Sequence, residues 1–444
     1  MNHRSLSAKF YIKTMGCQMN DYDSDYLARL LLNNGYSPAG SPEQADLILI
    51  NTCTVRAKPE QKAYSFLGRM SSLKERNPDL IIGMVGCLAQ MKGPELLRRF
   101  PVLDIVVGPR ELVRFQRVLD KVQGKSRRVV ATCLDLRPPN PVSFRGYFSG
   151  RVTANLSIMQ GCNNFCSYCI VPHVRGREVS RPHREILAEA GSLIREGVRE
   201  ITLLGQNVNS YRWQGDGKTW DFPRLLGELG EMGGLLRLRF TTSHPKDLSE
   251  DLIDSFSRIG NLCAHIHLPF QAGSNRILKL MGRGYTREIY LERVQALRKS
   301  IPPIAITSDV MVGFPGESER DFELTLDLIR RVGFDSLFSF KYSDRVGTSA
   351  EKMGGKVPEP VKASRLKALQ DLQKEISIKL NKALVGTLQQ VLIEGPSKKG
   401  GEITGRTESN KVVNFICDQS MIGQLHKVLI KHASLNSLWG EIAD

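Results

Sequence analysis

Cys162, Cys166 and Cys169 lie within one short loop, in the string GCNNFCSYC. Three thiolates at this C-x3-C-x2-C spacing can wrap one iron–sulfur cubane. Such a cluster takes four ligands, so one iron would stay open to a molecule that chelates through an amine and a carboxylate. Zinc is the alternative, and it would need a fourth protein ligand, for which His173 is near in the sequence. The spacing favours the cluster.

Cys17, Cys53 and Cys87 form a second, dispersed group. Each of them ends an apolar run that reads as a strand, and a stretch of helical period follows each run. The strands are expected at 10–17, 46–53, 80–87 and 104–107, and the helices at 24–34, 57–77 and 94–100. Alternation of this kind predicts parallel βα units in an α/β domain.

These three thiols should converge in space, because ligands of an open parallel sheet bind at the carboxyl ends of its strands. A single cysteine at such a place is usually a small buried residue. Three at equivalent positions indicate a metal or cluster site, again with one iron left open for a sulfur species or substrate. Cys133, Cys263 and Cys417 lack this placement and read as ordinary cysteines.

The composition suggests a basic protein of a reducing compartment. The chain has 444 residues, a net charge of +16 and nine cysteines. The charge indicates a polyanion such as RNA, DNA or an acidic membrane surface, unless it is only a solvated basic face. An odd number of cysteines argues against complete disulfide pairing. No signal-peptide core or membrane-length apolar run is present, so a cytoplasmic protein without a membrane partner is expected.

The middle of the chain reads as six βα units, which predicts a partial (β/α)6 barrel. Its strands are expected at 153–159, 200–204, 236–241, 264–269, 304–312 and 336–342. Its helices are expected at 183–196, 222–232, 248–258, 287–299 and 319–332. Active residues of barrels lie at the carboxyl ends of strands. Polar residues at such places are Gln206, Asn207, Ser243, His244, His267, Gln271 and Glu317, each of which could instead have only a structural role.

Two further segments flank this barrel. Residues 112–151 carry nine Lys/Arg against two acidic residues, which fits either a solvated linker or a strip that contacts phosphates, and the prolines near 137–141 mark a boundary. A helix is expected at 361–383, followed by strands at 388–394, 402–406, 412–416 and 426–432, which predict a small β-barrel. The expected domains are 1–125 (α/β), 126–147 (basic linker), 148–378 (partial barrel) and 379–444 (small barrel).

The C-x3-C-x-aromatic-C string resembles the signature of the radical S-adenosylmethionine (SAM) superfamily, and the last segment resembles the RNA-binding TRAM module. Across the first 350 residues the chain is similar to the radical SAM methylthiotransferases, and most to the tRNA methylthiotransferases of the MiaB type. The strings that carry this likeness are TMGCQMNDYDSD, NTCTVRAK, VGCLAQ, MQGCNNFCSYCIVPHVRGRE, LLGQNVNSY, FTTSHP, HLPFQAGSN and VGFPGE. One mild departure is His173, where many relatives have tyrosine.

The resemblance implies two 4Fe–4S clusters and SAM as cofactors. Cys162, Cys166 and Cys169 would hold the cluster that cleaves SAM, and Cys17, Cys53 and Cys87 the cluster that carries sulfur. Tyr168, Gln206, Asn207, Asp309 and Glu317 would contact SAM. The implied reaction places a methylthio group on carbon 2 of isopentenyladenosine 37, in the anticodon stem-loop of tRNA. An electron donor such as flavodoxin and a monomeric enzyme are also expected.

Three rival functions remain at this point. Sister enzymes act on threonylcarbamoyladenosine in tRNA or on an aspartate of a ribosomal protein. The strings TMGCQMN and NDYDSD favour the isopentenyl enzyme by resemblance. A zinc-bearing RNA-binding protein without catalytic activity is the rival from another class.

Overall fold

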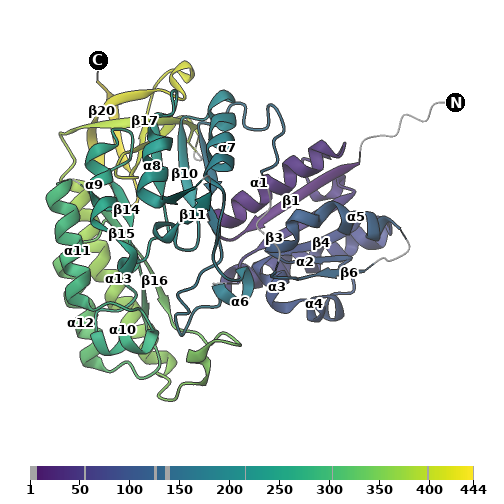
Figure 1. The fold of residues 1–444 in the computed structure, drawn as a ribbon, viewed down its shortest axis with the longest axis horizontal. Coiled ribbons are helices and arrows are strands. Elements are labelled where there is room, and N and C mark those ends of the chain that lie inside the picture. The colour runs from purple at the N-terminus through teal and green to yellow at the C-terminus, as the bar shows by residue number, and fades with distance from the viewer. Residues whose placement is uncertain are drawn as a thin grey trace. The chain divides into compact units, whose positions relative to one another are not determined.

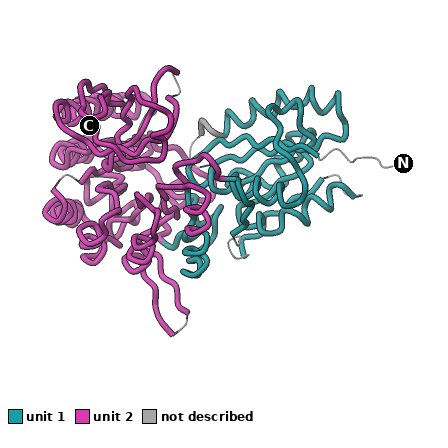
Figure 2. The backbone as a smooth tube through the Cα atoms, turned by 90° about the horizontal axis from the view of Figure 1, so that it is seen from above, with its two compact units in different colours: residues 1–147, 155–163, 170–189 teal, residues 148–154, 164–169, 190–444 magenta. Residues whose placement is uncertain are grey.

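The structure is a computed structural model, and it describes residues 8–54, 57–124, 128–135, 141–215, 217–302, 304–397 and 400–443. Two compact units are present (Figure 2). The first comprises residues 1–147, 155–163 and 170–189, and the second comprises residues 148–154, 164–169 and 190–444. Cys162 therefore belongs to the first unit, and Cys166 and Cys169 belong to the second. The central part of the predicted linker, residues 125–127 and 136–140, lies outside the described residues.

A parallel six-stranded sheet forms the centre of the first unit (Figure 1). The strand order is β2-β1-β3-β4-β5-β6, and all neighbours are parallel. The strands are β1 (Lys9–Met15), β2 (Ser37–Pro38), β3 (Leu47–Thr52), β4 (Ile81–Gly86), β5 (Ile105–Val107) and β6 (Val129–Ala131). The central strands β3 and β4 are buried almost throughout, because helices cover both faces of the sheet.

Alternating side chains of β3 supply both cores of this unit. Leu47 and Leu49 pack with residues of α1 and α5, whereas Ile48 and Ile50 pack with residues of α2, α3 and α4. These helices are α1 (Gln18–Asn33), α2 (Ala57–Arg76), α3 (Cys87–Lys92), α4 (Pro94–Arg99) and α5 (Phe115–Gln123). The predicted strands and helices are confirmed, but α1 begins six residues earlier than predicted (Gln18 rather than Ser24), because Cys17 caps it.

The partial barrel predicted for the middle of the chain is confirmed. Its parallel strands form two sheets, β13-β10-β7 and β14-β15-β16, and the amide of Cys263 links them by donating to the Leu238 carbonyl over 2.9 Å. The strands are β7 (Thr153–Ser157), β10 (Glu200–Leu204), β13 (Arg237–Phe240), β14 (His265–His267), β15 (Ala305–Val312) and β16 (Ser336–Lys341).

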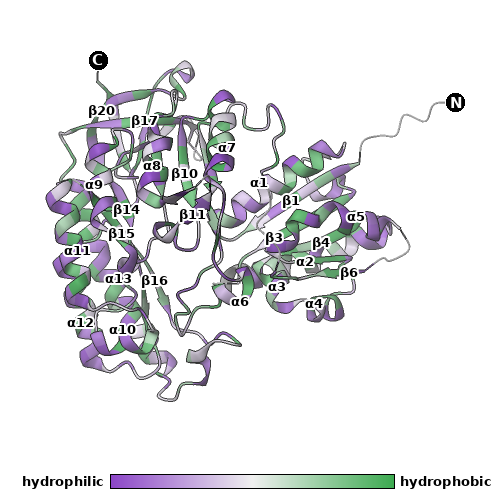
Figure 3. Cartoon of the chain, in the orientation of Figure 1, coloured by the Kyte–Doolittle hydropathy of each residue, from purple (hydrophilic) through white to green (hydrophobic). Residues whose placement is uncertain are grey.

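Helices flank the sheets of the second unit (Figure 1). They include α8 (Phe222–Gly230), α9 (Glu250–Arg258), α10 (Asn275–Met281), α11 (Arg287–Ser300), α12 (Glu319–Val332) and α13 (Glu359–Lys382). Ser249, Thr286 and Ser318 cap α9, α11 and α12 through side-chain oxygens, which explains where these helices begin. In Figure 3, α11 and α12 show both hydrophilic and hydrophobic segments, as amphipathic helices do.

The chain ends in a closed five-stranded barrel in the order β17-β18-β19-β21-β20. Its strands are β17 (Leu388–Pro396), β18 (Ile403–Thr407), β19 (Val412–Phe415), β20 (Leu425–Ala433) and β21 (Leu438–Ile442). Alternate residues such as Val391, Ile393 and Phe415 fill the interior. The sequence predicted four of these strands and missed β21. In the described parts of the chain, no helix is both long and apolar enough to cross a bilayer.

Candidate active site

Cys17, Cys53 and Cys87 lie at the carboxyl ends of three adjacent parallel strands, as the sequence predicted. Met15 of β1 pairs with Thr52 of β3, and Thr52 pairs with Gly86 of β4. Cys53 and Cys87 follow Thr52 and Gly86 directly, so they occupy equivalent places on neighbouring strands. Cys17 comes two residues after Met15 and caps α1. Strand register alone therefore brings the three thiols to one edge of the sheet.

The three thiols also interact electrostatically. A hydrogen bond with the Cys53 thiol is the main cause that lowers the pKa of Cys17 to about 6, and the Arg175 charge adds to it. Burial raises the pKa of the Cys87 thiol, while Arg175 opposes that rise. Cys53 and Cys87 are each 4% exposed, whereas Cys17 is exposed. The edge thus offers two buried thiols and one that solvent reaches.

Two buried asparagines tie this edge together, and the sequence reasoning missed them. Oδ1 of Asn20 accepts hydrogen bonds from the Cys17 amide at 3.2 Å and from the Cys17 thiol at 3.3 Å. Nδ2 of Asn20 donates to Oδ1 of Asn51 at 2.9 Å, and Nδ2 of Asn51 donates to the Asn20 carbonyl at 2.8 Å. The available signal was their offset from the cysteines in GCQMN and NTC.

Gly86 is required by the same packing. Its φ is +94°, and a Cβ there would lie 2.5 Å from Oδ1 of Asn51 and 2.8 Å from the Thr52 carbonyl oxygen. Any larger residue would displace the asparagine pair or the strand beside it. The glycine before Cys87 therefore has a steric reason.

Arg175 in α6 (Val171–Arg175) contacts the same edge. Its Nε donates to Sγ of Cys87 at 3.3 Å, and its Nη2 forms an ion pair with Asp23 at 2.6 Å. Both side chains are nearly inaccessible, at 3% and 4% exposure. No sequence signal indicated Asp23 or Cys87 as the partners of Arg175.

The three thiols at this edge are candidate ligands of an iron–sulfur cubane. Among the described residues, no group of three or more His, Cys, Asp or Glu side chains lies close enough to hold one metal ion. Three converging thiols beside a buried cation suit an anionic cluster with one open iron.

The loop of Cys162 begins against backbone of the first unit. The Cys162 amide donates to the Gly176 carbonyl at 3.2 Å. Gly161 before it has φ +85°, and a Cβ there would lie 2.1 Å from the Arg177 carbonyl oxygen. Arg110, 1% exposed, donates to the carbonyls of Arg175 at 2.9 Å and Arg177 at 2.7 Å. These bonds set where the loop leaves β8 (Met159–Gln160).

The remainder of the loop is held within the second unit. The Cys169 amide donates to the Cys166 carbonyl at 2.9 Å, which forms a tight turn. Ser167 donates two hydrogen bonds to the end of α10. Its amide donates to the Met281 carbonyl at 3.0 Å, and its hydroxyl donates to the Leu280 carbonyl at 2.9 Å. Backbone bonds therefore hold each part of this loop within its own unit, and the nine cysteines, all among the described residues, are free thiols.

Arg283 has the role here that Arg175 has at the other cysteines, and the sequence reasoning missed it too. Its Nη1 donates to Sγ of Cys166 and to the Tyr168 hydroxyl, each at 3.4 Å. Its Nη2 donates to the Pro269 carbonyl at 2.8 Å. Burial raises the pKa of the Tyr168 hydroxyl, and Arg283 opposes that rise. Tyr168 thus lies beside Cys166 with its ring positioned by a buried cation.

Of the predicted SAM-binding residues of the barrel, Gln206, Asn207 and Glu317 lie just beyond strand ends, whereas Asp309 lies within a strand. Gln206 and Asn207 follow β10, and Nδ2 of Asn207 donates to Asp247 at 2.8 Å. The Asn207 side chain is 2% exposed, and its Oδ1 has no hydrogen-bond partner within the described chain. Asp309 lies in β15, 3.6 Å from Nε2 of His267. A buried, unsatisfied amide oxygen beside a strand end suits a ligand donor.

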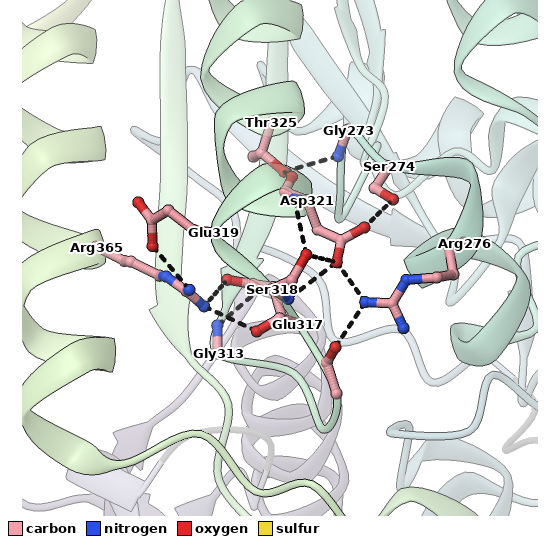
Figure 4. A network of polar contacts seen from close by, with 11 residues as sticks. Gly273, Ser274, Arg276, Gly313, Glu317, Ser318, Glu319, Asp321, Thr325 and Arg365 are labelled. Carbon is pink, nitrogen blue, oxygen red and sulfur yellow. Dashed lines mark hydrogen bonds and ion pairs between the residues drawn. The ribbon is translucent and has the colours of Figure 1, made fainter.

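Glu317 is engaged in protein contacts, which Figure 4 shows. Its Oε2 accepts from the Gly313 amide at 2.9 Å, and its Oε1 pairs with Arg365 of α13 at 2.8 Å. Both oxygens thus have protein partners, so a contact with SAM would have to share the carboxylate. The assignment of Glu317 to SAM stays a prediction, and the contacts show that it shapes the Gly313–Gly316 turn.

Comparison with known families matches three segments of the chain. Residues 156–329 match the Radical SAM superfamily, residues 9–108 match Uncharacterized protein family UPF0004, and residues 382–443 match the TRAM domain. The UPF0004 match covers the sheet that carries Cys17, Cys53 and Cys87, the Radical SAM match lies in the partial barrel, and the TRAM match covers the closed barrel.

Curated relatives match nearly the whole chain. A tRNA-2-methylthio-N(6)-dimethylallyladenosine synthase of Syntrophus aciditrophicus is 50% identical over 97% of this chain and 94% of its own length. One of the same name from Syntrophobacter fumaroxidans is 50% identical over 97% of this chain and 95% of its own.

Solved structures share the fold. The radical SAM methyltransferase TsrM of Kitasatospora setae, with cobalamin and a [4Fe-4S] cluster bound, has a TM-score of 0.56 at 16% identity, covering 87% of this chain and 81% of its own. The cobalamin-dependent S-adenosylmethionine radical enzyme OxsB has a TM-score of 0.53 at 14% identity. The match covers 83% of this chain and 56% of the OxsB chain.

Proposed function

Since this chain belongs to the family of the tRNA-2-methylthio-N(6)-dimethylallyladenosine synthases, we propose that its two groups of cysteines together methylthiolate carbon 2 of N6-isopentenyladenosine 37 in tRNA. The chain is a radical SAM enzyme, and membership of that superfamily implies a 4Fe–4S cluster and SAM. The observation that carries the proposal is the convergence of Cys17, Cys53 and Cys87 at one sheet edge, in a chain that also has the C-x3-C-x2-C loop.

The proposal assigns a different role to each of two clusters. Cys162, Cys166 and Cys169 would hold the cluster that supplies an electron for SAM cleavage, and the other three cysteines would hold a second 4Fe–4S cluster that supplies the sulfur. An aromatic C–H offers no acidity for general-base catalysis, so the cofactors carry the difficult chemistry and the protein supplies position. Each cysteine group leaves one iron without a protein ligand, as a site that binds a small molecule requires.

The residues near Cys166 position SAM in this scheme. Tyr168, which Arg283 holds in place, would lie against the adenine. Asn207, whose buried Oδ1 is unsatisfied, would accept from a ligand donor, with Gln206, Asp309 and Glu317 as further contacts. Arg283 would keep the Cys166 thiolate oriented through its Nη1 bond. His244 would stay neutral, since burial and the nearby Arg283 lower its pKa to about 2.

The RNA partner fits the charge and the C-terminal barrel. The net charge of +16 suits a polyanion, and the target base must leave its stack to reach an enzyme site. We assign the anticodon stem-loop as the region bound, flavodoxin as the kind of electron donor, a monomer as the state and the cytoplasm as the location. The domain boundaries proposed for this enzyme are those expected from the sequence, at 125, 147 and 378.

Mass spectrometry of tRNA nucleosides tests the function. The anaerobically reconstituted enzyme is incubated with SAM, sulfide, a reductant and tRNA that carries either isopentenyladenosine or threonylcarbamoyladenosine. The methylthio product is expected only from the isopentenyl tRNA, and variants that replace either cysteine group by alanine should form none. Product from the threonylcarbamoyladenosine tRNA would assign the activity on that base instead. A colourless protein that binds zinc and no iron would contradict the proposed function.

A further inference from the structure

Arg175 is held by several hydrogen bonds at the sheet edge that carries Cys17, Cys53 and Cys87. Its Nε donates to Cys87 Sγ at 3.3 Å, and its Nη2 to Asp23 at 2.6 Å. Its own carbonyl accepts from Nε of Arg110 at 2.9 Å. A guanidinium is planar, so two bonds from one edge fix its orientation. The donor toward Cys87 is therefore held in a single geometry.

One donor group of Arg175 has no protein partner among the described residues. This group is the buried Nη1. A buried cation is costly unless anions surround it, and the single carboxylate of Asp23 leaves one donor group unsatisfied. An additional anion at this edge would complete its surroundings.

We propose that Arg175 is a positioning residue of the cluster held by Cys17, Cys53 and Cys87, which orients the Cys87 sulfur through Nε and stabilises the more negative, reduced state of that cluster. The proposal rests on the proposed function, because it requires a cluster at these cysteines. Reduction potentials of iron–sulfur clusters depend on net charge and on hydrogen bonds to the sulfurs. A fixed N–H donor and a buried positive charge both raise the potential.

The experiment measures the midpoint potential of this cluster alone. The full chain carries Cys162, Cys166 and Cys169 all replaced by alanine, so that the other cluster is absent. Iron analysis comes first, and about four irons per chain are expected. If this parent protein binds no cluster, the proposed role of the three cysteines fails, independently of Arg175. A redox titration followed by electron paramagnetic resonance then compares the parent with its variants.

Two substitutions and a matched control decide the question. Arg175→Lys keeps the charge and removes the Nε–H donor, whereas Arg175→Met removes both. Arg181→Lys is the control, because Arg181 is an equally buried arginine that pairs with Glu189 at 2.9 Å and donates to the Ser157 carbonyl at 2.5 Å. The potential should become more negative in Arg175→Lys and more negative still in Arg175→Met, while the control stays at the parent value.

Three results would overturn the proposal. They are an unchanged potential in both Arg175 variants, an equal shift in the Arg181→Lys control, and loss of iron from Arg175→Lys while the control retains it. The last result would reduce Arg175 to a structural role. If only Arg175→Met loses iron, the proposal is judged from the midpoint potential of Arg175→Lys, which should still be more negative than that of the parent.

Discussion

The side-chain amide of Asn20 donates to Oδ1 of Asn51 over 2.9 Å, and both residues are completely buried. This bond joins the first turn of α1, three residues after Cys17, to the end of β3, two residues before Cys53. The pair is the framework on which the dispersed cysteines are arranged, so it makes a direct target for mutation.

Asn51→Ala should release iron from the dispersed cysteines. It would leave Nδ2 of Asn20 unsatisfied in the interior, which costs about 1–3 kcal/mol. The iron content of the protein that lacks Cys162, Cys166 and Cys169 should fall well below that of its parent. Asn77→Ala, at an exposed turn, is the control and should retain its iron. Full retention by Asn51→Ala would show that the asparagine pair is dispensable.

Arg283→Met should act on the other cysteine group. Its loss removes the hydrogen bonds to Cys166, Tyr168 and the Pro269 carbonyl. Iron should be lost from a protein that lacks Cys17, Cys53 and Cys87. Arg287→Met removes a similarly buried arginine that bonds Gly273 and Leu324 carbonyls instead. Equal iron loss in both variants would mean that general destabilisation, rather than the Cys166 contact, is responsible.

Arg239→Met should loosen the C-terminal barrel. Arg239 donates to the carbonyls of Glu408 and Thr407, each at 2.7 Å, and pairs with Glu200 at 2.9 Å. Removing it leaves a buried carboxylate uncompensated, which costs about 3–5 kcal/mol. Calorimetry should then resolve an early transition, with faster proteolysis between α13 and β17. The Glu200→Gln, Arg239→Met double variant should recover part of the loss, and no recovery would argue against the ion pair.

Asp321→Asn should destabilise the protein in a pH-dependent manner. Burial alone would raise the pKa of Asp321, but hydrogen bonds from Arg276, Ser274 and Ser318 outweigh it and hold the pKa below the ordinary 3.8 (Figure 4). The carboxylate therefore stabilises the fold above the unfolded-state pKa of about 3.9, and this contribution is lost as the pH falls through the folded-state value.

The thermal midpoints of the metal-free wild type and Asp321→Asn should differ by a constant amount between about pH 7 and 5, and the gap should narrow below about pH 4. The loss at neutral pH should be about 1.5–3 kcal/mol, as for hydrogen bonds to a charged group. Asp371→Asn, which removes an exposed ion pair with Lys367, should change little. A gap that is independent of pH would contradict the role of the charge.

Local sequence patterns were sufficient to predict much of the fold and the two groups of cysteines. The C-x3-C-x2-C spacing places three thiols in one loop whatever the rest of the chain does. Apolar periodicity predicted the parallel strands of both α/β parts, because residues two or four apart share a face irrespective of the fold. Cys17, Cys53 and Cys87 could be expected together since parallel strands of one sheet end at the same edge. The short strands β6 and β21 were missed, as three to five residues carry little periodicity.

Only the tertiary structure could reveal the polar residues that support these thiols. Arg175 reaches Cys87 across 88 positions of sequence, and Arg283 reaches Cys166 across 117. The partner of Glu317 is Arg365 on a distant helix. A local pattern cannot name such partners, because a long side chain finds its acceptor only after helices and strands have packed. The sequence by itself therefore determined which cysteines are candidates for the chemistry, and the packing of the chain decided which buried charges face them.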